Sequence, residues 1–246
     1  MCTVVIRVPE PDAPTADRVI RLLAIRDEDP ARPWRPLGPW WPDSHPALIG
    51  VQDVRAGGAW LAADARGGRL SVLLNRAETI SDPSPRSRGE VVLAAAAGDL
   101  SARPPRTHGF NLVRVDARGA GLLRWDGGEP RESAIPPGTH MIAHDDLDDP
   151  TTPRIARWLG SFRAAAPAEG EVWWEPWLEV IRTSAGLAPG DDEAIVRDNR
   201  PHGYPTQSLL LCVASVGVDG AEVRYGELPQ PAAWGRVRLR PAERRL

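Results

Sequence analysis

The second residue of the chain, Cys2, combines two groups that could act together in catalysis. Cysteine is small enough for removal of Met1, which would leave Cys2 with both a thiol and a free α-amine. A free cysteine thiol has a pKa of about 8.5 and an α-amine one of about 7.7–8.0, so near neutral pH the amine can accept the thiol proton. One residue would then hold a nucleophile and its base. The alternative is that Cys2 only begins a buried strand, because free cysteine packs like a small apolar side chain.

The composition is typical of an ordinary soluble globular protein. The 246 residues are 42% hydrophobic and 26% charged, with a formal net charge of -3. All 30 basic residues are arginine, and they alternate with acidic residues, so neither a nucleic-acid partner nor a membrane-surface partner is predicted. Only Cys2 and Cys212 are cysteines, which excludes a disulfide framework and favours a reduced cytoplasmic setting. No leader pattern and no apolar run of about 20 residues occurs, so we expect neither secretion nor membrane insertion.

Short apolar or alternating runs, broken by Pro, Gly and Asp, predict strands in the first half of the chain and again near its end. They are Cys2–Val8, Arg18–Ile25, Ala47–Val51, Ala59–Ala63, Arg69–Asn75, Ser208–Val216, Ala221–Glu227 and Arg236–Arg240. Glycine-containing turns predict hairpins at Asp64–Gly67, Asp116–Gly119 and Val218–Gly220. Segments 30–46 and 188–205 are predicted to be long surface loops, which commonly border a binding site.

Three helices are predicted between these strands. The first covers Ser87–Gly98, because Ser87 and Glu90 fit an S-x-x-E capping box before an apolar run. The second lies near Thr152–Ala166 and the third near Glu171–Gly186, where a Trp-rich apolar stripe has helical spacing and indicates core packing. This order of strands and helices favours stacked antiparallel sheets covered by helices over a doubly wound parallel sheet.

Seven short strings resemble the NRDE family, also called the transport-and-Golgi-organisation protein 2 family. In the family's order and over nearly the whole chain, they are Met1-Cys2, Ala24-Ile25-Arg26-Asp27-Glu28, Gly57-Gly58-Ala59-Trp60-Leu61, Leu74-Asn75, Arg88-Gly89-Glu90, Gly109-Phe110-Asn111-Leu112 and Pro137-Gly138-Thr139. The resemblance implies one domain over residues 1–246 with an α+β fold similar to the N-terminal nucleophile hydrolases. That fold is a four-layer αββα sandwich of two antiparallel sheets.

The resemblance to the cysteine amidases of that fold implies catalytic roles for four residues. Cys2 would attack an amide carbonyl with its own amine as base, and Asn75 would donate to the oxyanion. Arg26 and Asp27 would orient the thiol and the amine, because a guanidinium favours thiolate and a carboxylate holds an ammonium in place. The alternatives are a solvated strand end for Arg26 and Asp27, and a turn residue for Asn75.

Three positions depart from the family pattern. Ile25 replaces Asn, which removes a polar side chain near the expected site; His144 replaces Asn; and Gln207 replaces Arg in the string Tyr204–Ser208. We expect Trp60, His144, Tyr204 and Gln207 to contact the substrate. His144 is a proton shuttle or, alternatively, a surface residue before an acidic turn. No metal site is predicted, because the segment after His140 has neither HExxH nor EF-hand spacing.

Two functions of different classes follow from the resemblance. The first is an N-terminal cysteine amidohydrolase or acyl transferase that acts on a small non-peptide amide or thioester and requires no cofactor. The second is a non-catalytic binding or trafficking protein of the same fold for haem or an acyl or lipid ligand, which the changes at His144 and Gln207 favour.

Overall fold

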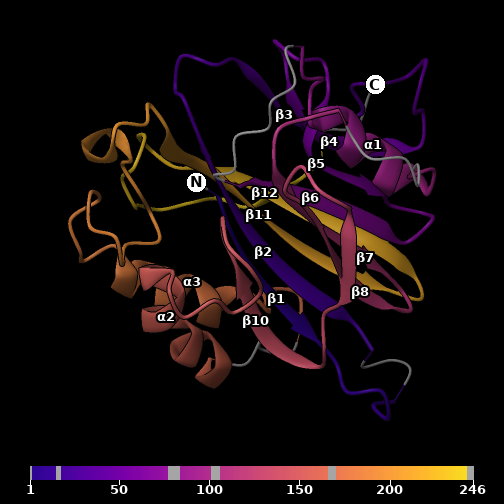
Figure 1. Cartoon of the computed structure of the whole chain (residues 1–246). Coiled ribbons are helices and arrows are strands. Elements are labelled where there is room, and N and C mark those ends of the chain that lie inside the picture. The colour runs from indigo at the N-terminus through magenta and orange to yellow at the C-terminus, as the bar shows by residue number, and fades with distance from the viewer. Residues whose placement is uncertain (1, 15–17, 77–83, 101–105, 166–169, 243–246) are drawn as a thin grey trace.

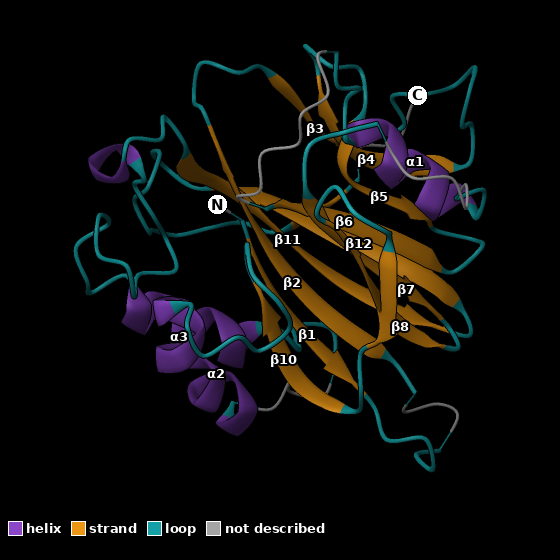
Figure 2. Cartoon of the chain, in the orientation of Figure 1, coloured by secondary structure: helices purple, strands orange, loops and turns teal. Residues whose placement is uncertain are grey.

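Two antiparallel sheets face each other in the computed structural model, which describes residues 2–14, 18–76, 84–100, 106–165 and 170–242. Helices α2 (Pro153–Ala164) and α3 (Glu175–Ser184) cover the outer face of one sheet, and α1 (Gly89–Ala97) covers the outer face of the other (Figures 1 and 2). The four-layer αββα arrangement implied by the resemblance is therefore confirmed.

The first sheet has six strands and the second has seven. The six-stranded sheet has the order β10 (Gly138–Ile142), β1 (Thr3–Val8), β2 (Ile20–Glu28), β11 (Gln207–Gly217), β12 (Gly220–Glu227) and β13 (Arg240–Pro241). The seven-stranded sheet follows the chain: β3 (Trp34–Gly38), β4 (Leu48–Asp53), β5 (Ala59–Asp64), β6 (Arg69–Asn75), β7 (Phe110–Asp116), β8 (Gly119–Trp125) and β9 (Arg131–Ala134). All pairs are antiparallel, and the three predicted hairpin turns join β5 to β6, β7 to β8 and β11 to β12.

Alternation along the strands separates three apolar layers. On β1, Val4 and Ile6 belong to the core between the sheets, whereas Val5 belongs to the core under α2 and α3. The predicted Trp stripe of the third helix lies in that outer core, where Trp177 is fully buried. Both faces of the central strands are thus covered, which explains why they read as nearly continuous apolar runs.

Alternation also corrects one expectation about the site. Ile25 is 1% exposed and packs in the core under the helices, whereas Cys2 belongs to the core between the sheets. Successive side chains of a strand point to opposite faces, so the Asn-to-Ile change does not remove a polar group beside the Cys2 thiol.

The predicted capping box does not form. Helix α1 begins at Gly89, and its N-cap Arg88 makes no side-chain capping bond, while the Ser87 hydroxyl accepts from the Gly89 N–H at 3.2 Å. The reason is a backbone contact: a Cβ on Gly58 would lie 2.6 Å from the carbonyl carbon of Gly89. The start of the helix is therefore set by its contact with the start of β5, not by a local cap.

Other boundaries differ because tertiary pairing extends or shortens what local patterns indicate. Strand β2 continues through Glu28, β3 lies inside the segment predicted as a loop, and the predicted strand Arg236–Arg240 is reduced to the two-residue β13. Helix α3 begins four residues later than predicted, at Glu175, and the segment 188–205 is a loop with a short 3-10 helix, η2 (Arg200–His202). Ala166, the last residue of the second predicted helix, lies outside the described residues.

Candidate active site at the amino-terminal cysteine

A cavity of about 430 Å³ opens at the end of the sandwich where β1 and β5 begin and β2 and β6 end. Five of the eight residues predicted for the site line it: Cys2, Arg26, Asp27, Asn75 and Trp60. They come from both sheets, so the cavity exists only because the two sheets stack with these ends together. The remaining lining residues are Glu28, Arg32, Asp53, Ala56, Ala59, Leu73, Pro85, Arg86, Ser87, Arg88, Gly89 and His108.

The Cys2 thiol is 6% exposed and lies 3.8 Å from the backbone carbonyl of Asp27, to which it donates. Burial raises the pKa of this thiol, the negative charge of Asp27 raises it further, and Arg26 opposes both. The expected activation of the thiol by Arg26 is therefore outweighed, and the thiol is protonated at neutral pH. A base must remove its proton for it to act as a nucleophile.

Asp27 is 5% exposed and its carboxylate turns to polar groups on the helix side of the sheet. Ser208 donates to Oδ1 at 2.6 Å and Asn199 approaches Oδ2 at 3.5 Å. A register shift between Ser208 and Leu210 on β11 places Ser208 opposite Asp27. Asp27 thus connects the Cys2 cavity, through its backbone, with a buried polar network behind the sheet.

Arg26 and Glu28 lie on the same face of β2, and Arg26 Nη2 pairs with Glu28 Oε2 at 3.3 Å. The Nε of Arg32 lies 2.6 Å from Oδ2 of Asp53 and 4.0 Å from Oε2 of Glu28. The cavity floor is therefore charged and internally paired, and the solvated strand end considered from the sequence is excluded for Arg26, which is 3% exposed.

Two residues of the matched strings, Arg88 in the cavity and Asn111 outside its lining, had no predicted role. Arg88, the N-cap of α1, lines the cavity and donates from Nη1 to the Gly109 carbonyl at 3.1 Å. Asn111 is fully buried and donates to the carbonyls of Ala143 and Asp145, which ties β7 to the loop after β10. The available signal was their occurrence in the matched strings, with Asn111 a polar residue inside the apolar strand β7.

The other three predicted substrate-binding residues are not among the lining residues of this cavity. Tyr204 is 54% exposed, and Gln207 pairs with Asp198 in an isolated bridge. His144 belongs to the network behind Asp27: its Nε2 lies 3.1 Å from Asp145 and its Nδ1 3.5 Å from Arg154. Burial and the charge of Arg154 lower the pKa of His144 to about 4, so it is neutral at pH 7.

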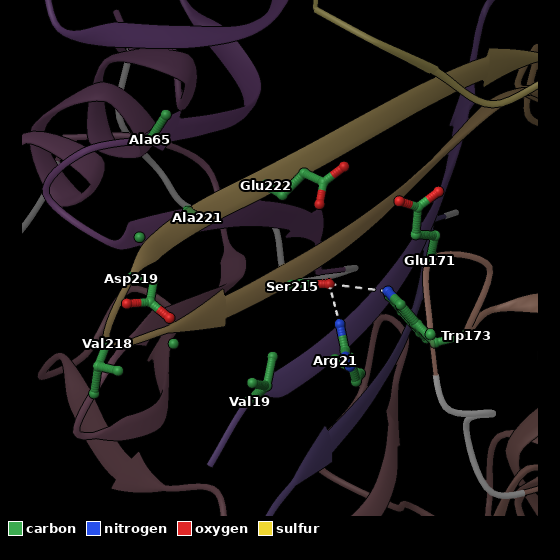
Figure 3. Close-up of a pocket in the computed structure, with 13 residues that line it drawn as sticks. Val19, Arg21, Ala65, Glu171, Trp173, Ser215, Val218, Asp219, Ala221 and Glu222 are labelled. Carbon is green, nitrogen blue, oxygen red and sulfur yellow. Dashed lines mark hydrogen bonds between the residues drawn. The ribbon is translucent and has the colours of Figure 1, made fainter. Parts of the chain in front are cut away.

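A second cavity, of about 350 Å³, lies at the opposite end of β2 (Figure 3). Its Ser215 hydroxyl accepts from Arg21 and, at 2.9 Å, from Trp173, and the Arg21 guanidinium stacks 5.0 Å from the Trp173 ring. None of the described residues that line it is a cysteine or a histidine. The only hydroxyl among these lining residues is that of Ser215, which accepts from two donors, so the Cys2 cavity is the better candidate for chemistry.

Two further classes of site are absent from the described part of the chain. No group of three or more His, Cys, Asp or Glu side chains is placed to hold a metal ion. No helix there is long and apolar enough to cross a bilayer.

Comparison with known proteins identifies relatives over most of the chain. The family profile "Transport and Golgi organisation 2" matches residues 1–202. A mouse protein described as "Transport and Golgi organization 2 homolog" is 30% identical over 166 residues, which cover 61% of this chain and 59% of the mouse protein. The matched region thus spans less than two thirds of that relative's length.

Proposed function

Because the chain belongs to the transport and Golgi organisation 2 family, and because Cys2 shares a cavity with Arg26 and Asn75, we propose that it is an N-terminal cysteine amidohydrolase or acyl transferase. The substrate is a small non-peptide amide or thioester, and Cys2 is the nucleophile. The observation that carries this proposal is the position of the Cys2 thiol at a charged cavity of a size suited to a small molecule.

The reaction begins after Met1 has been removed, when Cys2 carries a free α-amine. This amine takes the thiol proton, the sulfur attacks the substrate carbonyl, and a tetrahedral oxyanion forms. Asn75 donates a hydrogen bond to that oxyanion. As the intermediate collapses, the ammonium returns the proton to the leaving amine or thiol, and an acyl thioester remains on Cys2. Water or an acceptor then takes the acyl group.

The electrostatics of the site support an adjacent base. Burial and Asp27 hold the Cys2 thiol in its protonated form, so the reaction needs a proton acceptor within reach of the sulfur. Two nearby carboxylates are already engaged, Glu28 with Arg26 and Asp53 with Arg32. An α-amine on the same residue is available to the thiol without any rearrangement of these pairs.

The proposal is tested by mass spectrometry of the purified protein before and after iodoacetamide. We expect an intact mass that lacks Met1 and alkylation at Cys2 in preference to Cys212, because Cys212 is fully buried and burial raises the pKa of its thiol.

The control is Cys2→Ala, which should abolish the fast alkylation and leave Cys212 unmodified. Retention of Met1 in the native protein would remove the proposed base, and preferential labelling of Cys212 would contradict the assignment of the nucleophile.

A further inference from the structure

Two residues that line the Cys2 cavity each carry a buried N–H donor that has no hydrogen-bond partner among the described residues. The donors are Nη1 of Arg26, from the six-stranded sheet, and Nε1 of Trp60, from the seven-stranded sheet. The two residues are 3% and 7% exposed. Leaving a buried donor unpaired costs about 1–3 kcal/mol, and more for a charged group, so a pair of them at one cavity indicates a missing acceptor.

Arg88 adds a guanidinium to the same cavity. Arg88 is the N-cap of α1, and its guanidinium donates to the Gly109 carbonyl, with no carboxylate of the described chain at ion-pair distance. Burial lowers the pKa of Arg88, while Glu28 and Cys2 oppose that shift. A partly buried cation without a carboxylate partner is unfavourable unless an anion joins it.

The charge of the lining residues favours an anion. Four arginines (Arg26, Arg32, Arg86 and Arg88) and three acidic residues (Asp27, Glu28 and Asp53) line the cavity, and the Asp27 carboxylate turns away to Ser208, so positive charge is in surplus there. Arg32 is engaged by Asp53, and Arg26 is only partly engaged by Glu28. Among the described residues no carboxylate lies at ion-pair distance from Arg86 or Arg88, so the surplus resides with these two guanidinium groups.

We propose that Arg88, with Nη1 of Arg26 and Nε1 of Trp60, forms a subsite for a carboxylate of the substrate. This inference rests on the proposed function and narrows the substrate class to small amides or thioesters that also carry a carboxylate. A guanidinium matches a carboxylate with two parallel N–H donors, which orients as well as binds it. Fixing that end would hold the amide or thioester carbonyl at the Cys2 sulfur.

The fold keeps Arg88 at this place. Gly58 and Gly89 touch backbone to backbone, since a Cβ on Gly89 would lie 2.9 Å from the Ala59 nitrogen. The contact sets the first turn of α1 against the first residues of β5, immediately before Trp60. Arg88 and Trp60 are thus presented to the cavity by one rigid junction, although they are far apart in sequence.

The subsite is tested with two alkylating reagents of nearly equal shape, iodoacetate and iodoacetamide, which differ in carrying a carboxylate or a neutral amide. The measured quantity is the rate of Cys2 alkylation by iodoacetate divided by the rate with iodoacetamide. It is compared with the same ratio in a peptide of residues 2–8. We expect the ratio in the protein to exceed that of the peptide about tenfold, as for a charge-assisted hydrogen bond.

Arg88→Gln should reduce the ratio to near the peptide value, and Arg88→Lys should retain part of it. Arg118→Gln is the matched control, because Arg118 is 94% exposed in the β7–β8 turn, and it should leave the ratio unchanged. A wild-type ratio equal to that of the peptide, or an unchanged ratio in Arg88→Gln, would overturn the subsite.

If neither reagent reaches Cys2, calorimetry with the monoamide and the diamide of glutaric acid decides the question, because they differ by one carboxylate. Binding of the monoamide that is at least tenfold tighter and is lost in Arg88→Gln supports the subsite, while equal affinities or no binding overturn it. Neither readout requires acyl transfer. If neutral amides acylate Cys2 but the alkylation-rate ratio of the protein equals that of the peptide, the proposed function stands and the subsite is refuted. If the ratio is raised but no amide or thioester acylates Cys2, only the proposed function is refuted.

Discussion

Asp27 illustrates how single residues distant in sequence hold the site together. The carboxylate is buried, and a buried charge is tolerated only when it is paired or hydrogen-bonded. Ser208 serves two groups at once: its hydroxyl donates to Asp27 at 2.6 Å and accepts from the Arg197 backbone N–H at 2.8 Å. This residue therefore couples β2 to the loop that precedes β11.

Ser208→Ala should lower the free energy of unfolding by about 1–3 kcal/mol, because the Asp27 carboxylate and the Arg197 N–H each lose a hydrogen bond inside the protein. The measurement is the midpoint of urea unfolding at constant slope. Ser133→Ala is the matched control, since Ser133 is exposed on β9, and it should change stability by less than about 0.5 kcal/mol. Equal midpoints for the two variants would show that the hydroxyl of Ser208 is dispensable.

Asn75 tests whether the cavity performs acyl transfer. Asn75 is the last residue of β6 and lines the cavity, so the sheet fixes its backbone at the edge of the cavity. Loss of one preorganised oxyanion donor lowers turnover about 10²–10³-fold. Asn75→Ala should therefore lower kcat by about that factor and leave KM nearly unchanged, measured on any small amide or thioester that wild type hydrolyses. Wild-type turnover by this variant would identify Asn75 as a turn residue only.

At the scale of elements, the site depends on how α1 meets β5. The helix has no side-chain cap, and its start is held by the backbone contact between Gly58 and Gly89. Neither glycine leaves room for a Cβ, because the nearest atoms are backbone and cannot rotate away. The two matched strings that contain these glycines are thereby explained by one contact.

Gly58→Ala should destabilise the protein by about 1–3 kcal/mol, the cost of overpacking a filled site. Gly160→Ala offers the opposite control: nothing lies within 4 Å of its added Cβ, and Ala is favoured in the interior of α2, so stability should rise by about 0.5–1 kcal/mol. Thermal unfolding of both variants checks the pair, and the prediction fails if Gly58→Ala is as stable as wild type.

For the whole molecule, the network between the six-stranded sheet and α2 makes stability depend on pH. His144 lies there with Asp145 and the buried Arg154, and its pKa in the folded protein is about 4, below its ordinary value of about 6.5. Between these values the unfolded chain binds a proton that the folded protein does not, so stability falls as pH falls from about 6.5 to 4.

His144→Asn should remove this contribution, on the order of 2–3 kcal/mol between pH 7 and pH 4. Urea unfolding at pH 7, 5.5 and 4 measures it, with His45→Asn, in the loop between β3 and β4, as the matched control. The unfolding free energy of His144→Asn should change less with pH than that of wild type or of His45→Asn. A profile identical to that of wild type would contradict a neutral, buried His144.

The sequence by itself determined much of the local structure. Apolar alternation and glycine turns predict most strands and all three hairpins, because these features depend on neighbouring residues alone. The matched strings also point to Cys2, Arg26, Asn75 and Trp60, which the structure brings to one cavity.

Only the tertiary structure decided which groups those residues meet. The face occupied by Ile25, the partners of Asp27 and the arrival of Arg88 beside Trp60 depend on strand register, a bulge in β11 and the stacking of two sheets. The capping box failed for the same reason, since a backbone contact between residues 31 positions apart outweighs a local hydrogen bond. Long-range packing sets these relations, and no short-range pattern contains them.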